Sequence, residues 1–142
     1  MKTKPKTDWE ARFSCEKPLT IKTIEKSFAD IPAGSRMLIV TPKMVDEEVR
    51  KLPKGSIVEQ SDIRKLLSKR YKSDYACPVT TGIALRVVSE RAYIQVTTGV
   101  GDSEVTPFWR VVAPSSDLAQ KLSCGKNFIA QKRREERSLT RQ

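Results

Sequence analysis

The sequence predicts an α/β domain, mostly helical with a small β element, built around a helix-turn-helix. Two amphipathic helical patterns, over residues 42–52 and 57–71, are separated by the turn PKGS and are followed by a third helical pattern over 79–93. The next stretch, YIQVTTGVGDSEV, places glycines between two β-prone runs, which is typical of a β-ribbon or wing. Helix, short helix, loop and third helix in this order predict a winged helix-turn-helix.

The first two helices carry clear boundary and face signals. Thr41 followed by Pro42 is a typical N-cap with proline at the first helical position, and Pro53 ends the pattern. In the second helix the apolar residues share one stripe, and the opposite face is polar and basic. The stripe consists of Ile63, Leu66, Leu67 and Tyr71, and the opposite face of Ser61, Lys65, Ser68 and Lys69.

The third helix is apolar over most of its circumference. At 100° per residue, the expected buried arc contains Ile83, Ala84, Leu85, Val87, Val88 and Ala92. A narrow polar strip remains, made of Gly82, Arg86, Ser89 and Glu90. A slim strip that begins with glycine suits close approach to a partner. Thr80 and Thr81 stand at the start of this helix, where either can contact a partner or cap the helix after Pro78.

The chain divides into one main domain, over 41–137, and flanking segments. Residues 1–17 mix Lys, Thr and Pro, which predicts a mobile or loosely docked basic arm. Residues 18–40 form an N-terminal extension packed on the domain, in which RMLIV is either a strand or the lead-in to the next helix. A closing helix, with Phe128 and Ile129 inward and its Lys and Arg residues outward, should fray over 138–142.

Composition points to a polyanionic partner. The 142 residues carry a net charge of +10, with a pI near 9.7, and nucleic-acid phosphates are the commonest partner of such a protein. The chain shows no signal-peptide pattern and no apolar run of membrane length, so we expect a cytoplasmic protein without membrane contact. We also expect a monomer.

Histidine and cysteine usage exclude several classes of chemistry. The chain has no histidine, which removes Ser/His/Asp triads, Cys/His pairs and zinc sites that need an imidazole. Cys15, Cys77 and Cys124 are far apart and form no CxxC pair, so neither a zinc knuckle nor a dithiol redox site is indicated. We therefore expect no metal and no cofactor.

The run TPFWRVV, from Thr106 to Val112, places a rigid proline before two large aromatics and an arginine. Together with VRKLPKGSIVEQSDIRKLL, TGIALRVV and KRREE, in this order, it resembles the C-terminal DNA-binding domain of the alkylguanine-DNA alkyltransferases. The resemblance covers about Val45 to Glu136. It implies the winged helix-turn-helix of that domain.

In this resemblance Pro107, Arg110 and Val111 match the family's Pro-Cys-His-Arg-Val motif, while Phe108 stands at the alkyl-accepting cysteine and Trp109 at the histidine. Phenyl and indole rings have no usable lone pair for accepting a methyl group, so we expect no alkyl transfer and no enzyme. The pattern looks most like the alkyltransferase-like proteins, which bind alkylated guanine without repairing it and flag it for excision-repair proteins.

The expected function is therefore non-catalytic binding of double-stranded DNA, with recognition of an alkylated or flipped guanine. The candidate DNA-binding residues are Thr80, Thr81, Gly82, Arg86 and Ser89 on the third helix and Gln60, Ser61, Lys65 and Lys69 on the second. The candidate base pocket consists of Pro107, Phe108, Trp109 and Arg110. The arginine that the family inserts into DNA would fall near Val79 or Thr80, so insertion should be weak or absent.

Four alternatives remain open from the sequence. Phe108 and Trp109 can instead belong to the hydrophobic core, and Arg110 to a buried hydrogen-bonded anchor. The protein can also be a winged-helix transcriptional regulator of unmodified duplex DNA or a protein-interaction domain. An enzyme that uses Cys77 or Cys124 is the least supported alternative.

Overall fold

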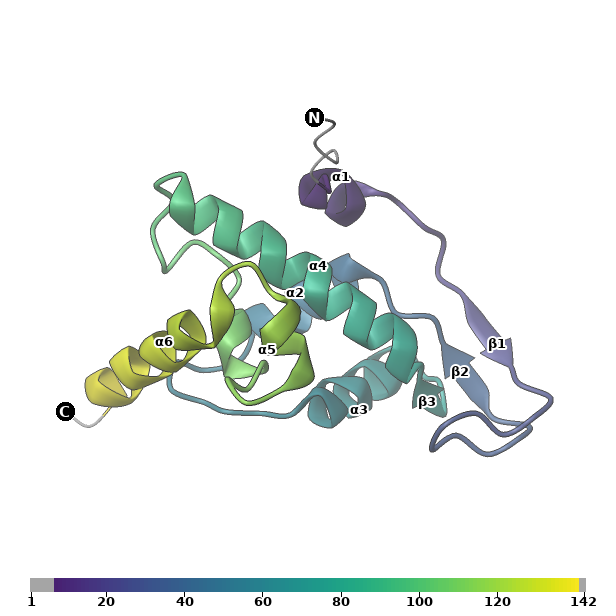
Figure 1. Ribbon diagram of the computed structural model, residues 1–142. Coiled ribbons are helices and arrows are strands. Elements are labelled where there is room, and N and C mark those ends of the chain that lie inside the picture. Colours follow the sequence, from purple (N-terminus) through teal and green to yellow (C-terminus); the bar gives the residue numbers. More distant parts are fainter. Residues whose placement is uncertain (1–6, 141–142) are drawn as a thin grey trace.

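The structure is a computed structural model that describes residues 7–140 of the chain. It is a mixed α/β fold in which roughly half of the residues are helical (Figure 1). This confirms the predicted α/β class. The element order is α1 (Trp9–Ser14), β1 (Ile21–Thr23), β2 (Arg36–Leu38), α2 (Pro42–Arg50), α3 (Gln60–Arg70), β3 (Tyr75–Ala76), α4 (Pro78–Thr97), η1 (Phe108–Arg110), α5 (Asp117–Lys121) and α6 (Gly125–Thr140).

Helix α4 runs through the centre of the molecule, and α1, α2, α3 and η1 pack against it (Figure 1). Its inner face joins α2, α3 and the η1 turn in one hydrophobic core, with Val45, Leu67, Leu85 and Phe108 among the fully buried side chains. Burial of apolar side chains of this size contributes about 1.5–3 kcal/mol each. The core thus ties the second half of the chain to the predicted helix-turn-helix segment.

The starts of α2 and α3 follow their local signals. The Thr41 side chain accepts a hydrogen bond from the Met44 backbone N–H at 3.4 Å, and Pro42 occupies the first helical turn, as predicted. Helix α3 begins with a capping box in which Asp62 accepts from the Glu59 backbone N–H at 2.8 Å. These caps fix where α2 and α3 begin, and α3 is followed by the segment that leads into α4.

The small β element lies before and between the helices. Among the described residues, three short strands form a sheet in the order β1-β2-β3, antiparallel between β1 and β2 and parallel between β2 and β3. RMLIV is therefore a strand, which was one of its two predicted states. The sheet packs the N-terminal extension on the domain by pairing it with Tyr75 and Ala76, just before α4.

The wing predicted over YIQVTTGVGDSEV is wrong. Helix α4 continues to Thr97, because Val96 extends the helical spacing of Val88 and Ala92 against the core. The helix ends beside Gly99, whose φ of +99° suits glycine. TPFWRVV is likewise not a strand, since Phe108–Arg110 form a single 3₁₀ turn. Packing of the apolar side chains decided these states, and their β propensity did not.

Both ends of the described chain are helical. Helix α1 docks on α4, whereas residues 1–6 of the predicted mobile arm lie outside the described residues. Helix α6 continues to Thr140, two residues beyond Ser138, after which fraying was predicted, and residues 141–142 lie outside the described chain. Within residues 7–140, no helix combines the length and apolar character needed to cross a bilayer.

Candidate nucleic-acid interface

A hollow of about 330 Å³ lies over the N-terminal half of α4, and we call it the α4 groove. It brings together residues from α3, α4 and α5, which are far apart in the sequence. The lining residues are Gln60, Pro78, Val79, Gly82, Ile83, Arg86, Leu118 and Lys121. This groove therefore collects predicted DNA-binding residues from both helices of the predicted helix-turn-helix.

Gln60, Gly82 and Arg86 are the predicted residues that line the α4 groove. The Gln60 amide donates a hydrogen bond to the Pro78 backbone oxygen at 3.4 Å, which joins the start of α3 to the start of α4. A Cβ atom on Gly82 would lie 3.5 Å from the same Gln60 amide nitrogen. Glycine at this position thus leaves the floor of the groove open.

Thr81 and Ser89 do not belong to the exposed strip, contrary to prediction. Both are buried, and their hydroxyls donate to the backbone oxygens of Cys77 and Leu85 at 2.7 Å. Thr80 is half-buried, where its hydroxyl accepts from the Val40 backbone N–H at 3.0 Å. None of these three hydroxyls is free to contact a partner on the surface, because each already satisfies backbone groups.

The observed exposed strip of α4 is rotated from the predicted one. Glu90 was predicted to lie on the polar strip but is buried. Its carboxylate accepts hydrogen bonds from the Ser123 backbone N–H and hydroxyl, both at 2.9 Å. Val79 and Ile83, by contrast, are 53% and 56% exposed. The turn between α5 and α6 covers the Glu90 side of the helix, and this leaves two apolar side chains facing the α4 groove.

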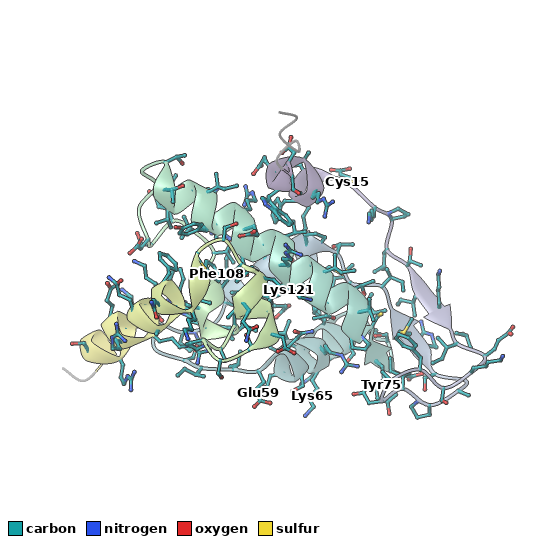
Figure 2. The ribbon with its side chains drawn as sticks, viewed as in Figure 1. Cys15, Glu59, Lys65, Tyr75, Phe108 and Lys121 are labelled. Atoms are coloured by element: carbon teal, nitrogen blue, oxygen red, sulfur yellow. The ribbon has the colours of Figure 1, made fainter. Side chains whose placement is uncertain are left out.

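Lys121 lines the α4 groove, whereas Lys65 and Ser61 line a separate hollow that also contains Asp30 and Asp74. Ser61, Lys65 and Lys69 are exposed on α3, as predicted, and Lys121 is exposed at the end of α5. Figure 2 shows the side chains of Lys65 and Lys121. In the part of the chain that the structure describes, none of these three lysines forms an ion pair within 4 Å. Their charges therefore remain available to anions. Sequence reasoning missed Lys121, although its helical segment begins at a serine cap that the sequence shows.

Arg86 lies at the border between the α4 groove and helix α1. Its guanidinium carbon is 5.3 Å from the ring centroid of Trp9, and its Nε is buried without a hydrogen-bond partner among the described residues. The neighbouring Arg91 is held more firmly, with Nε 2.5 Å from the Glu10 carboxylate and its guanidinium 4.0 Å from the Phe13 ring centroid. Helix α1 thus partly covers the arginine predicted to contact DNA.

The aromatic residues of the predicted base pocket are packed in the core. Phe108 is 0% and Trp109 is 2% exposed, and Pro107 is also buried. The Phe108 ring stacks at 6.1 Å on Phe128 of α6 and meets the Trp109 ring edge-on at 5.4 Å. In this conformation no face of Phe108 is free to stack on a base, which is the core alternative that the sequence left open.

Arg110 is a largely buried anchor held by an ion pair. Its Nε and Nη2 donate to the Glu136 carboxylate at 2.9 and 2.8 Å, and its Nη1 donates to the Leu52 backbone oxygen at 2.7 Å. Burial raises the pKa of Glu136. The pKa nevertheless stays below its ordinary value, because Arg110 donates hydrogen bonds to the carboxylate and lies beside it as a positive charge. Trp109 and the Gly55 backbone N–H lower the pKa further. The pair fixes η1 between α2 and α6.

A second hollow, of about 290 Å³, is lined by Pro107, Trp109 and Arg110 of the predicted base pocket. Asp102, Lys132 and Glu135 line it together with residues from the end of α2, and it shares no residue with the α4 groove. The Trp109 indole nitrogen is buried and forms no hydrogen bond of normal geometry with the described residues. The structure therefore does not bring the predicted base-pocket residues and the α4 residues to one opening.

The described residues contain no cluster of three or more Cys, Asp or Glu side chains that could hold a metal ion. Comparison of the chain with family models, with curated proteins and with solved structures finds no significant match. The geometry of the α4 groove and the charge around it are the basis for the functional conclusion.

Proposed function

We propose that the protein is a non-catalytic DNA-binding protein that places the α4 groove against duplex DNA, in the manner of a helix-turn-helix domain. The observation that supports this most is the α4 groove itself, which combines the exposed apolar side chains Val79 and Ile83 with the unpaired Lys121. An apolar floor beside an unpaired cation fits a duplex, whose base edges are flanked by two phosphate backbones.

In the proposed binding mode, one set of residues contacts the phosphates and another contacts the base edges. Lys65, Lys69 and Lys121 contact phosphates, which supplies most of the affinity and makes it fall with salt. Val79 and Ile83 reach the base edges, where apolar side chains contact thymine methyl groups or widen a base step. Gly82 lets the helix backbone approach closely.

The test is fluorescence anisotropy of a labelled duplex at several salt concentrations. The double variant Lys65→Gln/Lys69→Gln should lower the slope of log K against log salt by about 0.9 for each phosphate that is no longer neutralised. Lys22→Gln/Lys26→Gln is the matched control, because it removes the same charge from exposed positions at the outer edge of the sheet. Equal losses of affinity in the two variants would show that only net charge matters, and no binding at low salt would favour a protein-interaction domain.

Recognition of alkylated guanine, with excision-repair proteins as partners, is a second candidate that the matches at Pro107, Arg110 and Val111 favour. The burial of Phe108 and Trp109 argues against base stacking on these rings in this conformation. We therefore expect equal Kd values for a duplex with one methylated guanine and its unmodified twin. Clearly tighter binding of the methylated duplex would establish lesion recognition and would require η1 to rearrange.

A further inference from the structure

A third hollow, of about 390 Å³, carries arginines along one face of α6, and we call it the arginine hollow. Its floor consists of small or apolar residues, and no carboxylate lines it. The lining residues are Gly55, Ile57, Pro114, Ala130, Arg133, Arg134 and Arg137. The sequence predicted this basic segment only as an outward helix face, whereas the fold combines it with two loops into a concave, positively charged surface.

Two of these arginines have no carboxylate partner among residues 7–138. The Arg133 Nε donates to the Trp109 backbone oxygen at 2.6 Å, which fixes the direction of the side chain. Burial lowers the pKa of Arg133, which reflects a guanidinium removed from water without a nearby acid. Arg134 is exposed and forms no ion pair within that range. Guanidinium groups held in this way suit a bidentate contact with a phosphate.

The arginine hollow and the α4 groove lie close together, because two short segments of chain join a residue of one to a residue of the other. Ile57 lines the first and Gln60 the second, and three residues span at most about 11 Å. Pro114 likewise lines the arginine hollow and Leu118 the α4 groove, and four residues span at most about 14 Å. One duplex, whose major groove is about 12 Å wide, can therefore reach both hollows.

We propose that the arginine hollow is a second phosphate-backbone contact of the same duplex, so that the DNA footprint extends from the α4 groove across the start of α5 to α6. This inference rests on the proposed function. An acidic protein segment is the competing occupant. The short separation of the two hollows favours DNA, because one rigid polyanion reaches both, whereas an acidic peptide bound in the arginine hollow would have no need of Lys121 beside the α4 groove.

The experiment measures the salt dependence of duplex binding for Arg134→Gln/Arg137→Gln. Arg133 is left intact, since its hydrogen bond to Trp109 supports the fold. The slope of log K against log salt should fall by about 1.8, which corresponds to two phosphates that are no longer neutralised, at 0.9 each. Arg134→Lys/Arg137→Lys should keep most of the slope, and Lys22→Gln/Lys26→Gln should leave it near the wild-type value. Circular dichroism confirms that each variant is folded.

The outcomes separate this inference from the proposed function. If wild-type protein binds no duplex at low salt, both are wrong. If wild type binds and Arg134→Gln/Arg137→Gln keeps the wild-type slope, only the extended footprint is wrong. A labelled poly-glutamate peptide serves as the competing probe. If the peptide binds wild type but not Arg134→Gln/Arg137→Gln, and that variant keeps the wild-type salt slope for DNA, the arginine hollow binds acidic protein segments and not DNA.

Discussion

The ion pair between Arg110 and Glu136 is the most informative point at which to perturb the molecule. Its side chains are only 12% and 8% exposed, and the carboxylate also accepts from the Gly55 backbone N–H at 3.1 Å. It links η1, the loop after α2 and helix α6. Glu136→Gln keeps the size of the side chain and removes its charge, which leaves the Arg110 guanidinium buried without a counter-ion.

Breaking a buried ion pair by removing one partner costs about 3–5 kcal/mol. Glutamine still accepts hydrogen bonds, so we expect the free energy of unfolding to fall by about 3 kcal/mol for Glu136→Gln. Arg110→Met should cost a similar amount, because it also leaves the Leu52 oxygen without its donor. The double variant should be about 2 kcal/mol more stable than the sum of the two single effects predicts, since neither unpaired charge remains.

Urea denaturation, followed by circular dichroism, provides the four free energies of this cycle. Destabilisation below about 1 kcal/mol, or additive effects, would refute the view that the pair holds η1 in place. A duplex-binding assay on the same variants is the control. The pair shares no residue with the α4 groove, so variants that remain folded should bind DNA with unchanged slope.

The same pair makes stability depend on pH. The pKa of Glu136 is lower in the folded protein than its ordinary value, so its carboxylate adds stability that is fully present above the unfolded pKa. That stability is lost as the pH falls through the folded pKa. Wild type should therefore lose more stability on acidification than Glu136→Gln, and parallel pH profiles would contradict this assignment.

Four further predictions concern the core and the thiols. Phe108→Ala should cost about 3–5 kcal/mol by opening a cavity, and Phe108→Cys should accept no labelled methyl group from methylated DNA, because no histidine is present to activate the thiol. Trp109→Phe should cost only about 1–2 kcal/mol in urea denaturation, since the indole N–H forms no hydrogen bond of normal geometry; destabilisation above about 3 kcal/mol would show that it does. Burial and the Glu90 charge raise the pKa of Cys124 to about 11, so at pH 8 about one thiol in a thousand is ionised there. Mass spectrometry after alkylation should find exposed Cys15 modified well before Cys124, and equal rates would contradict the raised pKa.

Local signals predicted the helix starts well and the β element poorly. Thr41 and Pro42 begin α2 as expected, because a cap acts within one helical turn. The stretch after Tyr93 contains β-branched residues and glycines, yet α4 continues to Thr97 because Val96 packs on the core. Whether such a stretch forms helix or strand depends on the surface that it packs against, and that surface comes from distant parts of the chain.

The residues of the candidate site were likewise predicted only in part. Gln60, Gly82 and Lys65 were predicted from helical spacing and lie where a partner can reach them, whereas Ser89 was placed on the exposed strip and is buried. Helical spacing determines the angle of each residue around α4. It does not determine the position of the turn between α5 and α6, which covers one side of that helix through Ser123 and Glu90.

The sequence by itself determined the net charge of +10, the absence of histidine and the order of residues in the run TPFWRVV, which contains Phe108 and Trp109. These are properties of composition and order, and folding cannot change them. Only the tertiary structure decided that both rings are buried, that Arg110 pairs with Glu136 and that the arginines of α6 line one hollow with Gly55, Ile57 and Pro114. Each of these depends on contacts between residues far apart in the chain, which local propensity and periodicity do not encode.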